Sequence, residues 1–95
     1  MNFSEDDIAR ALARLDGWHR DGVAISKTFD RKNFDGAMRF VNAVAAEANL
    51  QNHHPDIALS WNEVAFTLSS HDAGALTERD FRLAAAIDRI ARDSA

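Results

Sequence analysis

The apolar residues of this chain recur first at helical spacing and then in alternation, and this change of period repeats along the sequence. Ser4 followed by acidic residues is typical of a helix start, because the serine caps backbone N–H groups and the acids face the positive end of the helix dipole. A helical stripe follows at Ile8, Ala11, Leu12 and Leu15. The pattern predicts a short amphipathic helix that stops at Asp16-Gly17.

Alternation of apolar and other residues surrounds Asp21-Gly22. The two alternating stretches are Trp18-His19-Arg20 and residues 23–29. Asp-Gly favours a two-residue turn, because both turn positions tolerate a positive φ. The sequence therefore predicts a first hairpin that turns at Asp21-Gly22.

Helical spacing returns at about Asn33 and lasts for the longest stretch of the chain. One face of this stretch is apolar and consists of Phe34, Ala37, Met38, Val41, Val44, Ala45 and Ala48. The helix should end before Asn52. Two histidines and Pro55 follow there, and the residue before a proline avoids the helical conformation.

The remaining pattern predicts a second hairpin and a last helix. Alternation over residues 57–61 and 64–69 indicates two strands that turn at Asn62-Glu63. Thr77 and Asp80 resemble a capping box, with Asp in place of the usual Glu. The helix that they open has an apolar side made of Leu83, Ala84, Ile87, Ile90 and Ala91.

The resulting order, α-β-β-α-β-β-α, favours an α+β fold. Each strand from Val23 onward has one bulky apolar face and one face of Ala, Ser and Thr, and each helix has an apolar stripe. The economical packing places all three helices on the bulky face of one four-stranded antiparallel sheet. The open face and the free strand edges then invite pairing with a second copy, so we expect a homo-oligomer.

Size and composition narrow the possible functions. With 95 residues, 46% of them hydrophobic and 27% charged, the chain is expected to form a single domain over residues 1–95 with one modest core. A net charge of -4, with basic and acidic residues interleaved, argues against direct nucleic-acid binding. There is no cysteine, no bilayer-spanning apolar run and no signal-peptide pattern, so we expect a cytoplasmic protein without membrane association.

Candidate chemistry gathers in the segment Asn52-His53-His54-Pro55-Asp56, with His71 at the far end of the second hairpin. Histidine titrates near neutral pH and is therefore a natural acid or base. Two adjacent histidines on an extended chain point to opposite sides, so His53 and His54 share a site only if the backbone bends, for which Pro55 offers a means. Structural or surface roles for the three histidines stay open at this point. His19, without a polar partner nearby in sequence, is expected at the surface.

Other chemistries fit these residues less well. Three imidazoles suit zinc, but the neighbouring positions of His53 and His54 differ from the usual ligand spacing, so we expect no metal. Ser69 and Ser70 lie near His71 without a recognisable nucleophile motif. Arg79 and Asp80 can be read simply as a solvated capping pair.

The spacing of these residues resembles the signature of the pterin-4a-carbinolamine dehydratases. It runs His53-His54-Pro55, five residues, Trp61, nine residues, His71, and then Asp80 within residues 77–81, and the similarity covers most of the chain. The resemblance implies a four-stranded antiparallel sheet with three helices on one face, homodimers or homotetramers, and no cofactor or metal. The implied reaction removes water from 4a-hydroxytetrahydropterin to give quinonoid dihydropterin, a step of tetrahydropterin recycling.

The resemblance also implies roles for individual positions. The matched histidines His53, His54 and His71 would be catalytic, with His54 and His71 as the acid–base pair and His53 mainly binding. Asp80, with Arg79 beside it, would orient a histidine or bind the polar edge of the pterin. The remaining positions expected at the substrate are Pro55, Ser70, Asp72 and Ala73, the last three through backbone contacts.

Two positions depart from the family pattern. Asn49 stands where the family commonly has Glu, and Ile57 replaces an aromatic residue often found there. The missing carboxylate could leave a histidine less basic. A competing function is a binding module, because the same fold serves in the family as a dimerisation partner for a homeodomain transcription factor and has been linked to enzyme assembly. The intact histidine trio favours catalysis, since a scaffold has no need of it.

Overall fold

A computed structural model describes residues 3–94 of the chain; residues 1, 2 and 95 of the predicted domain lie outside the described part. The elements follow the predicted order α-β-β-α-β-β-α, which confirms the α+β fold. Their bounds are α1 Glu5–Ala13, β1 His19–Asp21, β2 Ala24–Asp30, α2 Phe34–Gln51, β3 Asp56–Ser60, β4 Glu63–Leu68 and α3 Glu78–Asp93.

The helices begin at residues that satisfy their first backbone N–H groups. Ser4 and Thr77 each form a complete capping box, with Asp7 and Asp80 as the returning carboxylates, which confirms both predicted starts. Asn33 caps α2 by accepting a hydrogen bond from the N–H of Gly36. The chain thus fixes its helix starts through contacts three residues apart, which a sequence can specify locally.

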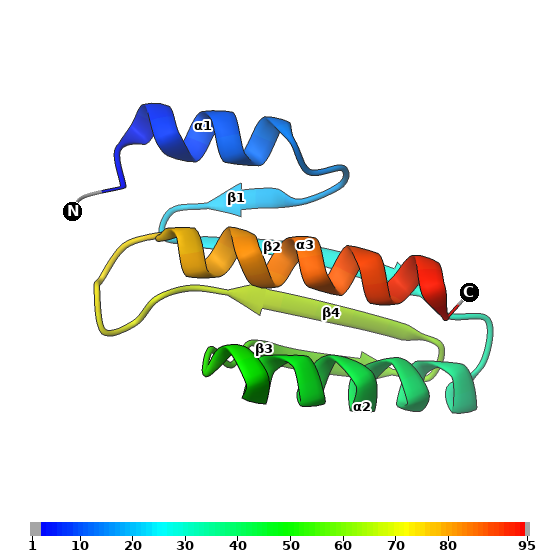
Figure 1. Ribbon diagram of the computed structural model, residues 1–95. Helices are drawn as coiled ribbons and strands as arrows, with labels where there is room; N and C mark the ends of the chain where they lie inside the picture. Colours follow the sequence, from blue (N-terminus) through cyan, green and yellow to red (C-terminus); the bar gives the residue numbers. More distant parts are fainter. Residues whose placement is uncertain (1–2, 95) are drawn as a thin grey trace.

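The strands form one antiparallel sheet in the order β1-β2-β4-β3 (Figure 1). The register aligns Ile25 with Leu68 and Phe29 with Val64, so their side chains share one face. Figure 1 shows α2 and α3 lying across this face, α2 beside β3 and α3 across β2 and β4. Ile8 brings α1 into the same buried cluster. The opposite face carries the small residues predicted for it.

The core is built around aromatic rings between the sheet and the helices. The rings of Phe29, Phe40 and Phe66 meet edge to face at centroid distances of 5.1 to 6.0 Å. Trp18 packs edge-on against Phe29 at 6.3 Å. Such edge-to-face pairs are favourable because the positive ring edge meets the negative face, and each adds about 1 kcal/mol to the burial itself.

Both hairpin turns lie one residue away from their predicted positions. Asp21 pairs with Ala24, so the first turn is at Gly22-Val23 rather than Asp21-Gly22. Ser60 pairs with Glu63, so the second turn is at Trp61-Asn62 rather than Asn62-Glu63. A slip by one residue would turn every apolar side chain of the strand away from the core, and this outweighs local turn preference.

Three further expectations need correction. Trp61, predicted within the strand pattern, lies in the turn with a φ of 56° and is 73% exposed. Ile57 has the predicted face but remains 40% exposed, because β3 is an edge strand. Helix α1 ends at Ala13, before Asp16-Gly17.

Among the described residues, no helix is both long and apolar enough to cross a bilayer.

Candidate active site

The end of α2 directs the two adjacent histidines into the rest of the molecule. Asn52 adopts the left-handed conformation with a φ of 51°, which Asn tolerates better than most residues. The N–H of His53 then returns to the carbonyl of Ala48 at 3.1 Å. This compact cap ends the helix where the sequence predicted and lets Pro55 lead into β3.

The two histidines lie just before the β3–β4 ladder, whose last pair is Asp56↔Thr67. Alternation along the extended chain then sends His53 and Ser70 toward the core, where both are buried, and leaves His54 exposed. The two adjacent histidines therefore point to opposite sides, and the bend for which Pro55 offered a means does not bring their side chains together.

His53 forms a buried pair with Asp80, which lies 27 residues further along the chain. The Nε2 of His53 lies 2.6 Å from Oδ1 of Asp80, and the two side chains are 8% and 0% exposed. An ionised carboxylate only accepts hydrogen bonds, so Nε2 of His53 carries the proton in this pair. Asp80 thus contacts a histidine, as one of the two predicted uses of this residue requires.

The second oxygen of Asp80 is satisfied from the start of α3. Ser70 Oγ donates to Oδ2 at 2.9 Å, and the backbone N–H of Thr77 donates to the same oxygen at 3.0 Å. Because Ser70 uses its proton on Asp80, the hydroxyl of Thr77 donates to Ser70 Oγ at 2.8 Å. Ser70 therefore contributes its side chain, in addition to any backbone contact. A buried carboxylate held by several donors stays in one geometry.

His54 lies on the outside and has a different kind of partner. Its Nε2 is 2.9 Å from Oδ1 of Asn49, in the last turn of α2. The amide oxygen of Asn49 thus lies where the resemblance implies a carboxylate. The Asn49 amide is uncharged, in contrast to the carboxylate that holds His53.

His71 sits in the loop between β4 and α3. Its Nε2 is 3.1 Å from Ser69 Oγ, and the loop closes through an isolated bridge between Ser70 and Ala75. Arg79 donates to Asp72 Oδ1 at 2.8 Å and ties the loop to α3. The hydrogen bond from the Arg79 guanidinium lowers the pKa of the Asp72 carboxyl below its ordinary range.

The other predicted positions are distributed around these contacts. Pro55 is half-buried on a trans peptide, and Ala73 is exposed. His19 is exposed, as predicted. Trp61 lies at the hairpin end of β3, away from His53 at the other end of the strand, so it does not join the histidines.

Sequence reasoning missed the side-chain roles of Ser69, Asn49 and the Thr77 hydroxyl. For Thr77 the capping-box spacing was a usable signal, because it pairs Thr77 with Asp80 through hydrogen bonds. Nothing local marked Ser69 as a histidine partner, whereas position 49 was marked by its departure from the family pattern, without a contact for the Asn49 amide. Within residues 3–94, no three His, Asp or Glu side chains gather closely enough to hold a metal ion.

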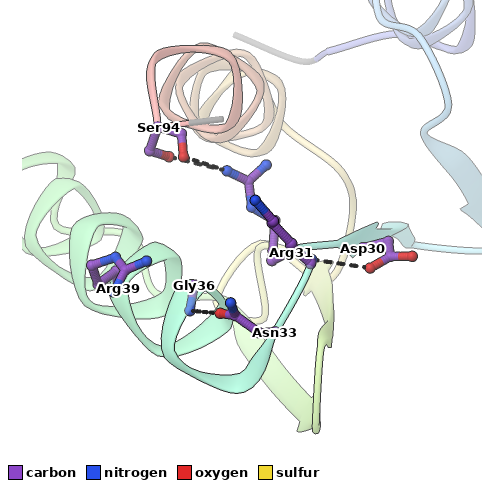
Figure 2. A pocket seen from close by; sticks show the side chains of 7 residues that line it. Asp30, Arg31, Asn33, Gly36, Arg39 and Ser94 are labelled. Carbon is purple, nitrogen blue, oxygen red and sulfur yellow. Dashed lines mark hydrogen bonds between the residues drawn. The ribbon is translucent and has the colours of Figure 1, made fainter.

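A cavity of about 400 Å³ lies elsewhere, between the end of β2 and the facing ends of α2 and α3 (Figure 2). No histidine is among the described residues that line it. Figure 2 shows the guanidinium of Arg31 pointing to Ser94, whose carbonyl it binds at 2.9 Å, and Asn33 turned to Gly36. The first contact joins the segment after β2 to the end of α3, and the second caps α2.

The sequence of this chain is similar to a family of known proteins. The family model described as pterin 4 alpha carbinolamine dehydratase matches residues 1–90. A relative from Nocardia farcinica is 47% identical over 90 residues, covering 95% of each chain, and one from Chloroflexus aurantiacus is 48% identical over 88 residues, covering 93% of this chain and 95% of the relative. Both are named provisionally as pterin-4-alpha-carbinolamine dehydratases.

Solved structures agree with the sequence relatives. A crystal structure described as a transcriptional coactivator/pterin dehydratase from Brucella melitensis matches with a TM-score of 0.89 and 32% identity over 95% of this chain and 98% of that one. A pterin dehydratase-like protein identified as a RuBisCO assembly factor in the alpha-carboxysome shares the fold, with a TM-score of 0.65 and 23% identity over 78% of this chain and 86% of that one. The chain belongs to the pterin 4 alpha carbinolamine dehydratase family.

Proposed function

We propose that this protein removes water from 4a-hydroxytetrahydropterin and yields quinonoid dihydropterin, as a step in tetrahydropterin recycling. Family membership supports the reaction class. The observation that carries the proposal is the arrangement of three histidines along one end of the β3–β4 pair, each held by a partner of different chemistry.

The reaction needs one acid and one base near neutral pH. N5 of the pterin loses its proton, the N5 electrons form the double bond to C4a, and the C4a–O bond breaks as the departing hydroxide takes up a proton. A single pair of imidazoles can exchange both protons, since histidine exists in both forms near pH 7. No redox step is involved, so the balance closes without a further reactant.

We assign the proton transfers to His54 and His71 and a binding and positioning role to His53. His54 and His71 are exposed, each with a single hydrogen-bond partner among the described residues. His53 is 7% exposed and tied to Asp80. Pro55, Asp72 and Ala73 lie beside these histidines in the chain, Arg79 binds Asp72, and all four would contribute to the substrate site.

The test is a dehydration assay with freshly prepared 4a-hydroxytetrahydropterin, followed through quinonoid dihydropterin. Wild type should accelerate the reaction above the uncatalysed rate, and His54→Ala and His71→Ala should each lose most of that acceleration. Absence of acceleration by wild type across pH 5 to 9 would reject the proposal. A chelator should leave the rate unchanged.

A second candidate function is that of a dimerisation or assembly partner. Exposed apolar side chains favour it: Phe34 and Met38, one turn apart on α2, are 48% and 39% exposed. The two functions separate in a deletion strain. Rescue by His71→Ala but not by Phe34→Glu would indicate the binding role, and the reverse result would indicate catalysis.

A further inference from the structure

We infer that Asn49 is a positioning residue that selects the ring tautomer of His54, so that Nδ1 is the atom through which His54 exchanges a proton. This inference rests on the proposed dehydration. The inference deepens that proposal by naming the reactive nitrogen of His54 and the residue that determines which nitrogen reacts.

The hydrogen bond itself defines the tautomer. Oδ1 of Asn49 lies 2.9 Å from Nε2 of His54. An amide oxygen has lone pairs and no proton, so Nε2 must carry the hydrogen. A neutral imidazole has only one N–H, and Nδ1 is then left with a free lone pair. His54 therefore both takes up and releases its proton at Nδ1.

The contact is fixed by the way α2 ends. Asn49 lies in the last turn of the helix, and its carbonyl accepts a hydrogen bond from the N–H of Asn52 at 3.2 Å. The left-handed conformation of Asn52 turns the chain back, so that His54 returns over the turn that carries Asn49. The backbone of Asn49 thus takes part in the cap, while its side chain contacts His54. A single residue couples the end of the helix to the ring of His54.

The partners of the three histidines differ in the ring tautomers that they allow. The carboxylate of Asp80 accepts a hydrogen bond from Nε2–H of His53 and carries a charge of its own. The hydroxyl of Ser69 can donate or accept, so it permits either tautomer of His71. The amide of Asn49 fixes the tautomer of His54 and adds no charge. His54 is therefore the histidine with a defined reactive nitrogen and a neutral partner.

The experiment measures ring nitrogens and catalysis in the same variants. In ¹⁵N-labelled protein above neutral pH, the His54 ring should show Nε2–H in wild type and in Asn49→Asp, which keeps an acceptor oxygen. Asn49→Leu should give a mixture of tautomers and a kcat roughly fivefold to tenfold lower, which corresponds to the loss of one neutral hydrogen bond. Asn49 is exposed, so these variants should fold.

Two features distinguish positioning from a general structural effect. Asn42→Leu, two turns earlier on the exposed side of α2, is the matched control and should change neither the tautomer nor kcat. Asn49→Asp should keep kcat near the wild-type value. It should also move the pH–rate profile to higher pH, because a carboxylate favours the protonated ring.

The outcomes separate the inference from the proposed function. A His54 ring that keeps the same tautomer in Asn49→Leu, or an unchanged kcat in that variant, would overturn the role of Asn49. Wild type without dehydration activity would instead overturn the proposed function. In that case the nitrogen spectra alone decide whether Asn49 fixes the ring.

Discussion

The Nε2 of His53 lies 2.6 Å from Oδ1 of Asp80, in a contact that joins the lead-in to β3 with the first turn of α3. Asp80 is at once the capping-box residue of α3 and the partner of a histidine. The start of a helix and the orientation of a candidate site residue therefore depend on one carboxylate. Changes at Asp80 should affect stability and activity together.

Asp80→Asn should destabilise the protein by about 2 kcal/mol, because both buried oxygens of Asp80 accept hydrogen bonds and an amide keeps only one of them. Urea unfolding followed by circular dichroism measures this change. The matched control is Asp93→Asn at the exposed end of α3, which should shift the free energy of unfolding by less than about 0.5 kcal/mol. Equal effects of the two substitutions would contradict the importance given to the buried pair.

His71→Ala should lower kcat by about 10² to 10⁴, the usual range for loss of a general acid or base. Because His71 is exposed and bonded only to Ser69 among the described residues, the melting temperature should hardly change. His19→Ala, another exposed histidine, serves as the control and should retain full activity. If both variants keep wild-type kcat in the dehydration assay, His71 has no catalytic role.

Asp72 should titrate below the ordinary aspartate value of about 3.9, because the Arg79 guanidinium lowers the pKa of its carboxyl. A group with a lowered folded-state pKa contributes stability that is present above its unfolded value and is lost as the pH falls through the folded value. The tie between the His71 loop and α3 should thus hold at neutral pH and fail only below about pH 4.

Carboxyl ¹³C shifts recorded against pH measure this titration directly. Arg79→Gln should return the Asp72 midpoint toward its ordinary value, whereas Arg82→Gln, one turn further along α3, should leave it low. An Asp72 midpoint that is the same in wild type and Arg79→Gln would contradict the ion pair.

Gly36→Ala should destabilise the protein, although alanine is normally favoured over glycine in a helix by about 1 kcal/mol. A Cβ added at Gly36 would lie 2.6 Å from the carbonyl oxygen of Arg31, which is too close for the backbone to accept without a shift. Thermal unfolding measures the effect. Asn42→Ala, exposed in the same helix, should be neutral or slightly stabilising.

The protein should sediment as a homodimer or homotetramer at micromolar concentration, above the 10.5 kDa of one chain. The reason is the edge strand β3 and the small-residue face of the sheet, which offer unpaired backbone groups and a flat surface. Ala58→Lys, on that face of β3, should weaken the assembly because a lysine blocks edge pairing. A wild type that sediments only as monomer would contradict this prediction.

The sequence by itself determined the features that depend on neighbouring residues. The periodicity gave the element order, and side chains three residues apart gave the starts of α1 and α3 at Ser4 and Thr77. The alternation after Asn52 separated the directions of His53 and His54. These are contacts along a helix or a strand, and their geometry is the same in every fold.

Only the tertiary structure decided what those residues meet. The hairpins turn at Gly22-Val23 and Trp61-Asn62 because strand register, set by the whole core face, outweighs the local preference of a turn. Asp80 reaches His53 across 27 residues because α3 packs over the sheet, and Asn49 reaches His54 because a left-handed Asn52 folds the chain back. Long-range packing and one unusual backbone angle are not encoded in residue spacing, so which histidine Asp80 and Asn49 each contact was decided only in the folded chain.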